Sequence, residues 1–250
     1  MEKSISPRSL PSSAAGRTPL LASFRVLDFL YPNRVPEPEA MDMEDEVDSY
    51  SAATAARHLA RLDGRFVRHL LTELPSDAVL DVGCGPGQIL LDYLRGRAVK
   101  GPSVRAVGVD LSLPMLSQAR RRGLVRVVVA NASSLPFRDG AFGLVFCNSV
   151  LHHMAEPSAD LAEMARCVAR GGRLLVRDLR RPLRPLVRPH LAFLGRHYAG
   201  RMKQLFEASV RAAYTPAEAR RLLSWAPAGT SRVRRRGLSY LEALWTRPSA

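Results

Sequence analysis

Apolar and polar positions follow two different rhythms along this chain. After Pro75, five short and nearly continuous apolar runs are each followed by a glycine or a polar residue, which is typical of parallel strands buried on both faces. We predict strands at 78–82, 104–109, 125–130, 144–147 and 173–177. Segments with helical spacing lie between them, at 86–95, 114–122 and 159–168. This alternation predicts an α/β fold, a doubly wound parallel sheet with helices on both faces.

The region before Pro75 shows helical spacing instead. Apolar positions three and four apart predict a helix that begins after Asp48 or Ser51; they are Ala55, Leu59, Leu62, Phe66, Leu70 and Leu71. Residues 20–31 have the pattern of a short amphipathic helix, whereas residues 1–20 are rich in Ser and Pro and lack an apolar cluster. We therefore divide the chain into a flexible N-terminal tail (1–34), an N-terminal helical segment (35–75) and a main domain (76–250).

The chain beyond residue 179 is expected to complete the sheet. Residues 180–214 carry apolar side chains at helical spacing and form a helical insertion, a candidate cap over the site. Thr215 and Glu218, with proline between them at the first helical position, form a capping box that predicts a helix start. Alternating patterns at 231–236 and 240–245 predict two closing strands, which would make seven in all.

The charge of the chain widens the range of partners. The 250 residues include 37 Lys and Arg against 23 Asp and Glu, a net charge of +14, and residues 166–250 hold 19 basic against four acidic residues. This permits a nucleic-acid partner, an anionic substrate or a charged membrane surface. Only three of the basic residues are lysine, and genome composition can produce the same arginine bias.

Cysteine usage and hydropathy indicate the compartment. The chain has three cysteines and no C-x-x-C pair, which argues against a disulfide framework and against a cysteine zinc site. No apolar run reaches the length of a membrane span, about 18 residues, and no secretory signal pattern is present. We expect a cytoplasmic protein without a membrane span.

The strongest candidate site follows the first predicted strand. Glycines at 83, 85 and 87 allow a tight turn and a close approach of the backbone to a ligand. Gln88 stands where a dinucleotide fingerprint requires a small residue, which weakens a nicotinamide reading. Asp110 ends the second strand, where a carboxylate can accept hydrogen bonds from both hydroxyls of a ribose. Together these residues predict a site for an adenosyl ligand without a pyrophosphate.

With these motifs the chain resembles the class I S-adenosylmethionine (SAM)-dependent methyltransferases, most closely the bacterial small-molecule type. The resemblance rests on LDVGCGPG (80–87), VGVDLS (107–112), the segment from ANASSLPF to VLHHM (130–154) and ARCVARGGRLLVRD (165–178). It implies a Rossmann-like seven-stranded sheet, SAM as the cofactor and methyl transfer as the reaction.

The resemblance also implies roles for single residues. Residues expected to bind SAM are Asp81, Gly83, Gly85, Gly87, Asp110, Leu111, Asn131, Ala132 and Asn148. The glycines would cradle its methionine part, Asp81 would hold its ammonium group and Asp110 its ribose. Asn131 stands where the family has aspartate, and its amide oxygen could accept the bond from the adenine amino group. Leu111 and Leu135 would be walls for the adenine.

His152 and His153 follow the fourth predicted strand and are the candidate catalytic residues. Either could act as a general base on the acceptor, or both could be loop histidines that only pack. No group of histidines and carboxylates has metal-ligand spacing along the sequence, so no metal is inferred.

We therefore expect a methyltransferase that acts on a small-molecule acceptor by in-line transfer. The helices before Pro75 or the insertion 180–214 would close the site, and Tyr198 and Tyr214 are weaker candidates for acceptor contacts. The alternative is an RNA-directed methyltransferase or a SAM-binding RNA-associated factor, suggested by the basic C-terminal third. It is disfavoured because the chain lacks a separate RNA-binding module and an aromatic–basic pattern.

Overall fold

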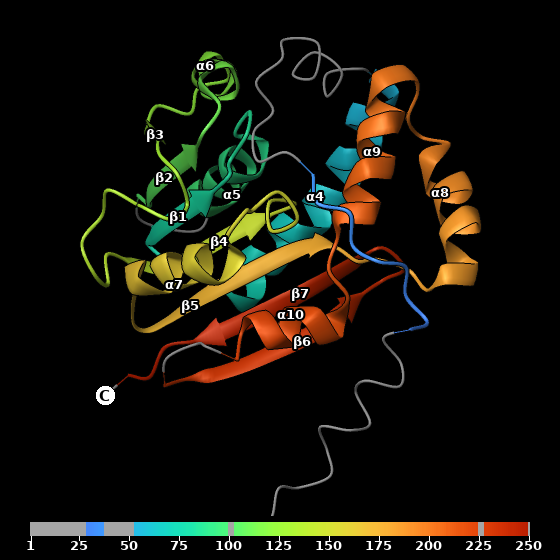
Figure 1. The fold of residues 1–250 in the computed structure, drawn as a ribbon. Coiled ribbons are helices and arrows are strands. Elements are labelled where there is room, and N and C mark those ends of the chain that lie inside the picture. Colours follow the sequence, from blue (N-terminus) through green and yellow to red (C-terminus); the bar gives the residue numbers. More distant parts are fainter. Residues whose placement is uncertain (1–28, 38–52, 100–102, 225–227, 250) are drawn as a thin grey trace, which may run out of the picture.

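A computed structural model describes residues 29–37, 53–99, 103–224 and 228–249. A mixed seven-stranded sheet runs through it in the order β3-β2-β1-β4-β5-β7-β6 (Figure 1). Its strands are β1 (Ala78–Val82), β2 (Arg105–Asp110), β3 (Val127–Val129), β4 (Phe142–Asn148), β5 (Val168–Leu179), β6 (Thr230–Arg236) and β7 (Tyr240–Thr246). β1 to β5 pair in parallel, and β7 pairs antiparallel with both β5 and β6. The predicted Rossmann-like fold class is confirmed.

Helices cover both faces of this sheet. One face is covered by α4 (Ala53–Glu73), α5 (Gln88–Ala98) and α6 (Leu113–Arg121), and the other by α7 (Pro157–Cys167) and α10 (Pro216–Leu222). Because β1 and β4 lie centrally, side chains of both faces are buried there, as the unbroken apolar runs predict. Phe66 of α4, for example, meets Phe146 of β4 edge to face, with ring centroids 5.8 Å apart.

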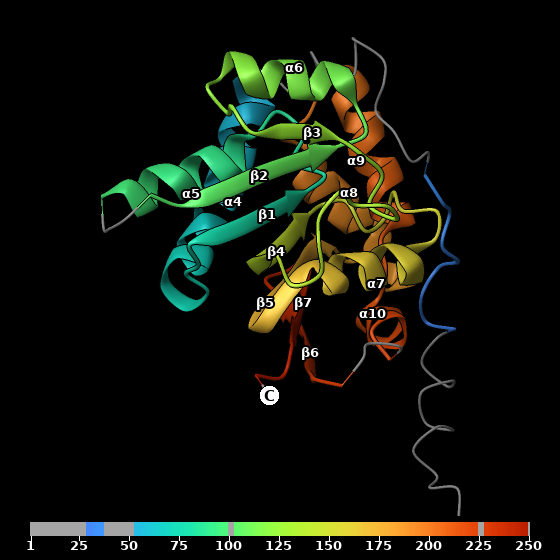
Figure 2. The same ribbon diagram turned by 90° about the vertical axis from the view of Figure 1, so that its left-hand side faces the viewer.

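The insertion forms α8 (Val187–Gly195) and α9 (Gly200–Ala212) after a short 3₁₀ turn, η1 (Arg184–Leu186). Both helices lie beyond the carboxyl ends of the strands (Figures 1 and 2). Their apolar stripe forms a separate small cluster around Tyr198, Met202 and Phe206, and the rings of Tyr198 and Phe206 lie 4.9 Å apart. The stripe therefore packs as an ordinary helical core.

Most predicted elements are present with shifts of a few residues at their ends. β5 is the largest departure, because it begins at Val168 and includes Gly171 and Gly172, where its register with β4 shifts. The capping box of Thr215 and Glu218 is present at the start of α10. The proposed caps Asp48 and Ser51 lie outside the described residues.

The end of the expected tail is attached to the domain. Of the short helix predicted at 20–31, only residues 29–31 are described, and they form a turn and a bend. The backbone oxygens of Leu30 and Tyr31 accept hydrogen bonds from the backbone and side chain of Arg184, at 2.8 and 2.9 Å. Residues 29–34 are therefore held against the insertion.

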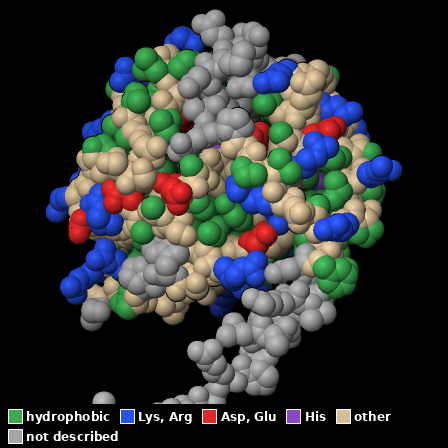
Figure 3. Space-filling model, viewed as in Figure 1, with side chains coloured by type: hydrophobic (Ala, Val, Ile, Leu, Met, Phe, Trp, Pro, Cys, Tyr) green, Lys and Arg blue, Asp and Glu red, His purple; other side chains and the backbone are tan. Residues whose placement is uncertain are grey.

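β6 is one edge of the sheet, and it carries exposed arginines at 232, 234 and 235. Charged side chains on an edge strand discourage pairing with another chain. In the view of Figure 3, basic side chains are scattered among acidic and hydrophobic ones. Within the described ranges, no helix is both long and apolar enough to cross a lipid bilayer.

Candidate SAM-binding site

A cavity of about 520 Å³ opens at the carboxyl ends of β1, β2 and β4. Its volume is within the range of small-molecule sites, about 300–1,000 Å³. The predicted residues that line it are Asp81, Gly83, Gly85, Asp110, Leu111, Asn131, Ala132, Asn148 and His153. Gly87, Leu135 and His152 do not line it.

Two glycines of the loop after β1 have different surroundings. Gly85 lines the cavity, whereas Gly87 packs against core side chains. Gly85 has a φ of +51°, and a Cβ added to it would meet no atom within 4 Å, so its open side faces the cavity that it lines. A Cβ on Gly87 would come within 2.8 Å of the Leu124 side chain. Gly87 therefore permits close packing at the start of α5 instead of contact with a ligand.

Asp110 is held in place by the backbone. Its Oδ2 accepts a hydrogen bond from Gly85 N–H at 2.8 Å, and its Oδ1 accepts one from Ser112 N–H at 2.9 Å. A carboxylate can accept about four hydrogen bonds in all, which is the capacity that binding both hydroxyls of a ribose uses. Asp110 thus joins the glycine loop to the loop after β2.

Acidic side chains gather around the cavity. Asp63, Asp81, Asp110 and Asp160 line it, and Arg122 is the only Lys or Arg among its lining residues in the described ranges. Burial raises the pKa of Asp81 well above its usual range, and the charges of Asp110 and Asp63 raise it further. Burial raises the pKa of Asp63 to about 6, although the Arg177 guanidinium opposes this. Carboxylates that repel one another in a buried site favour a positively charged ligand.

The β2–β3 side of the cavity has the apolar walls expected for a base. Leu111 leaves 40% of its surface exposed at the end of β2, and Met115 and Ala132 also line the cavity. Asn131 differs from the expectation, because its Oδ1 already accepts from both the N–H and the hydroxyl of Ser133, each at 2.9 Å. Leu135 is 4% exposed and belongs to the core on the α7 face.

The β4 side is organised by Arg177, a buried arginine of β5 that the sequence reading missed. Its guanidinium donates to Asn148 Oδ1 at 2.9 Å, lies 3.7 Å from Asp63 Oδ1, and stacks 4.1 Å over the ring of Tyr240. The side-chain oxygen of Asn148 is thus engaged within the protein. Arg177 connects α4 to the sheet and fixes this wall of the cavity.

The two candidate catalytic histidines have different surroundings. His153 lines the cavity. His152 is 2% exposed, and Asp178 accepts from both its backbone N–H at 2.9 Å and its Nδ1 at 2.6 Å. Burial alone lowers the pKa of His152, but the carboxylates of Asp178 and Glu37 more than offset this and raise it.

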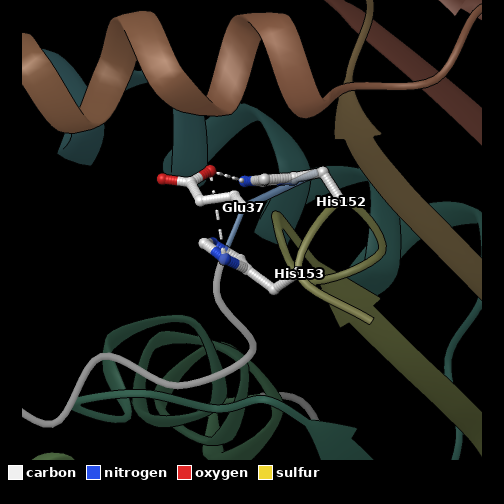
Figure 4. A group of neighbouring side chains, drawn as sticks. All are labelled: Glu37, His152 and His153. Atoms are coloured by element: carbon white, nitrogen blue, oxygen red, sulfur yellow. Dashed lines mark ion pairs between the residues drawn. The ribbon is translucent and has the colours of Figure 1, made fainter. Parts of the chain in front are cut away.

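The structure also brings Glu37 to these histidines. Its Oε2 lies 3.9 Å from His152 Nε2 and 4.0 Å from His153 Nδ1 (Figure 4). The sequence reading found no metal-ligand spacing because Glu37 is more than a hundred residues away along the chain. One possible ligand atom from each of the three side chains lies within 4.8 Å of the other two.

Of the two expected lids, α4 lines the cavity and the insertion does not. Leu59, Ala60 and Asp63 of α4 are lining residues, a role that the apolar stripe alone did not indicate. Tyr198 and Tyr214 are both under 10% exposed and are absent from the lining, so neither of these expected acceptor contacts is supported by the cavity. The Arg34 guanidinium instead stacks on the ring of Tyr214, with its central carbon 4.3 Å from the ring centroid.

Comparison with known proteins finds a methyltransferase family that matches part of this chain. Residues 80–176 match the family described as Methyltransferase domain. This part of the chain therefore resembles a methyltransferase domain. The crystal structure of the plantazolicin methyltransferase BamL in complex with triazolic desmethylPZN analog and SAH shares its fold, with a TM-score of 0.60 at 15% identity over 81% of this chain and 90% of that one.

Two curated relatives are similar to part of this chain. Demethylmenaquinone methyltransferase of Thermus thermophilus is 39% identical over 118 residues, 45% of this chain and 52% of that protein. Probable tRNA methyltransferase 9B of Mus musculus is 30% identical over 147 residues, 56% of this chain and 31% of that protein. This chain thus spans only 52% and 31% of these relatives.

Proposed function

We propose that this chain is a SAM-dependent methyltransferase that acts on a small-molecule acceptor by in-line methyl transfer. The observation that carries the proposal is the acid-lined cavity at the carboxyl ends of β1, β2 and β4, in a chain of net charge +14. SAM carries a sulfonium and an ammonium against one carboxylate, so a site with four carboxylates complements it.

The described residues can hold such a ligand across the carboxyl ends of the strands, with its adenine near β2 and β3 and its methionine part near β1. Ala132 and Leu111 would contain the adenine on the β2–β3 side, and Asp110 would accept from the ribose hydroxyls. Asp81 and the open side of Gly85 would receive the methionine part. SAM, when bound, supplies a methyl group on a positively charged sulfur that is already a good leaving group.

The acceptor would enter from the side of the cavity formed by α4 and β7. Leu59 and Asp63 of α4, Tyr240 of β7 and His153 after β4 line this side. They would orient the acceptor and exclude water, which lowers the barrier of a transfer that needs alignment more than chemical activation. The general-base role of the histidines stays a prediction, and His153 is the one of the two that lines the cavity.

RNA is the second candidate acceptor, favoured by the mouse relative that is named as a probable tRNA methyltransferase. Two observations argue for the small molecule. The arginines of β6 lie at an edge of the sheet, away from the cavity lining. Among the described residues, the charged side chains of the lining are four aspartates and one arginine, and this excess of negative charge repels phosphates.

A labelling experiment with paired glycine variants tests the function. The protein is incubated with methyl-labelled SAM and an extract fractionated into metabolites, RNA and protein. Gly85→Val fills the cavity, whereas Gly237→Val sets the same residue at a similar positive φ in the turn after β6, also with no atom within 4 Å of the added Cβ. We expect label in the metabolite fraction with wild type and Gly237→Val, and none with Gly85→Val. Label in RNA would favour the alternative, and equal labelling by both variants would contradict the assigned site.

A further inference from the structure

We propose that Glu37, His152 and His153 bind a divalent transition-metal ion of the zinc type beside the cavity. Figure 4 shows the Glu37 carboxylate facing both imidazole rings. One ligand atom from each residue, a carboxylate oxygen and two ring nitrogens, lies within 4.8 Å of the other two. Two imidazoles and one carboxylate are the protein ligands of many catalytic zinc sites, in which the fourth position stays open.

The distances within this group suit an ion better than a hydrogen bond. The Glu37 oxygen lies 3.9 and 4.0 Å from the two nitrogens, which is beyond hydrogen-bond length. Zinc bonds of about 2.0–2.2 Å place tetrahedral ligand atoms about 3.3 Å apart. Side-chain rotations that shorten the two Glu37 distances by less than about 1 Å, and the distance between the two histidine nitrogens by at most about 1.5 Å, would therefore complete the coordination.

His152 already has the outer partner that metal-bound histidines require. Asp178, itself fully buried, accepts from His152 Nδ1 at 2.6 Å, so Nε2 is directed toward Glu37. Such a carboxylate–histidine pair fixes the ring and raises its basicity as a ligand. This arrangement distinguishes the group from histidines and acids that meet by chance at a surface.

The segment that carries Glu37 is anchored on the same loop. Arg34 donates to the backbone oxygens of His152 at 2.9 Å and Ala212 at 2.7 Å, and Val35 N–H donates to Arg211 O at 3.2 Å. These contacts bring Glu37 to the histidines. The side chains of Glu37 and His152 are 8% and 2% exposed, whereas that of His153 is 15% exposed and lines the cavity, which leaves a path for the ion.

The test measures Zn²⁺ binding by tag-free protein after chelator treatment and dialysis. Zn²⁺ is titrated in competition with a chromogenic chelator, and Co²⁺ is used to detect the visible absorption of a tetrahedral site. We expect one equivalent bound by wild type. Glu37→Gln and His153→Gln should each weaken binding at least tenfold, and Asp178→Asn should weaken it by about 10–100-fold.

His197→Gln is the matched control, because it removes one histidine of the insertion outside the group. It should bind Zn²⁺ as wild type does. SAM titrations of the same samples check folding, and Glu37→Gln should retain SAM affinity because Glu37 does not line the cavity. Absence of stoichiometric Zn²⁺ binding, or equal binding by wild type and Glu37→Gln, would overturn the metal site. Since SAM binding is measured separately, that result would leave the proposed function standing.

Discussion

The cavity and the C-terminal third differ in the sign of their charged side chains and in where these side chains lie. Around the cavity, carboxylates lie close together, and few positive side chains offset their negative charge. Beyond residue 179, apolar side chains pack against one another, and the arginines of β6 point outward along a sheet edge. The net charge of the chain therefore does not predict the charge of its site. The poorly compensated carboxylates lie where a ligand can relieve their repulsion, whereas the arginines of β6 are exposed to solvent.

Among the variants that test this comparison, Asp110→Ala at the cavity is expected to have the largest effect, a loss of SAM affinity. The variant would remove the two hydrogen bonds that we propose between Asp110 and the ribose, each worth about 1.5–3 kcal/mol because the acceptor is charged. SAM affinity measured by calorimetry should fall by at least about a hundredfold. A variant with undiminished affinity would show that the acid-lined cavity is not the SAM site.

Phe206→Ala should have the converse effect. Removing a buried aromatic side chain from the insertion's cluster costs about 3–5 kcal/mol of unfolding free energy. Denaturant unfolding should show this loss, while SAM affinity stays unchanged because α9 does not line the cavity. If a folded Phe206→Ala protein lost SAM affinity, the insertion would contribute to SAM binding as well as to stability, which would contradict the expected difference between the two regions.

The acidity of the cavity predicts a pH dependence. The pKa of Asp63 is about 6 in the folded protein and lower in the unfolded chain, so the folded state keeps a proton that the unfolded state loses between about pH 4 and 6. The free energy of unfolding should therefore decrease as pH rises through this window. SAM affinity should change in the other direction and weaken below pH 6, by at most about tenfold per pH unit for one proton. Calorimetry across pH checks this, and Asp63→Asn should remove this contribution.

The smallest effect is expected for Arg234→Glu with Arg235→Glu on the sheet edge. Exposed substitutions of this kind usually change stability by less than about 0.5 kcal/mol. Methyl transfer to a small molecule and SAM affinity should be nearly unchanged. RNA binding by wild type that falls steeply with salt and is lost in this variant would instead support the RNA alternative.

The sequence by itself determined the features that depend on a few neighbouring residues. Unbroken apolar runs marked the central strands, and Thr215 with Glu218 marked the start of α10. Gly85 and Asp110 were found because Gly85 follows the end of β1 and Asp110 ends β2, and parallel strands bring their carboxyl ends to one edge of the sheet.

Tertiary packing decided which side chains face the cavity and which face the core. Gly87 and Leu135 fit the motif but turn inward, whereas Asp63 and Arg177, to which the motifs assigned no role, reach the site from a helix and a strand. Glu37 meets His152 only because Arg34 anchors its segment on the loop after β4. Such convergence across more than a hundred residues depends on how helices and loops pack around the sheet, and no local pattern along the chain encodes it.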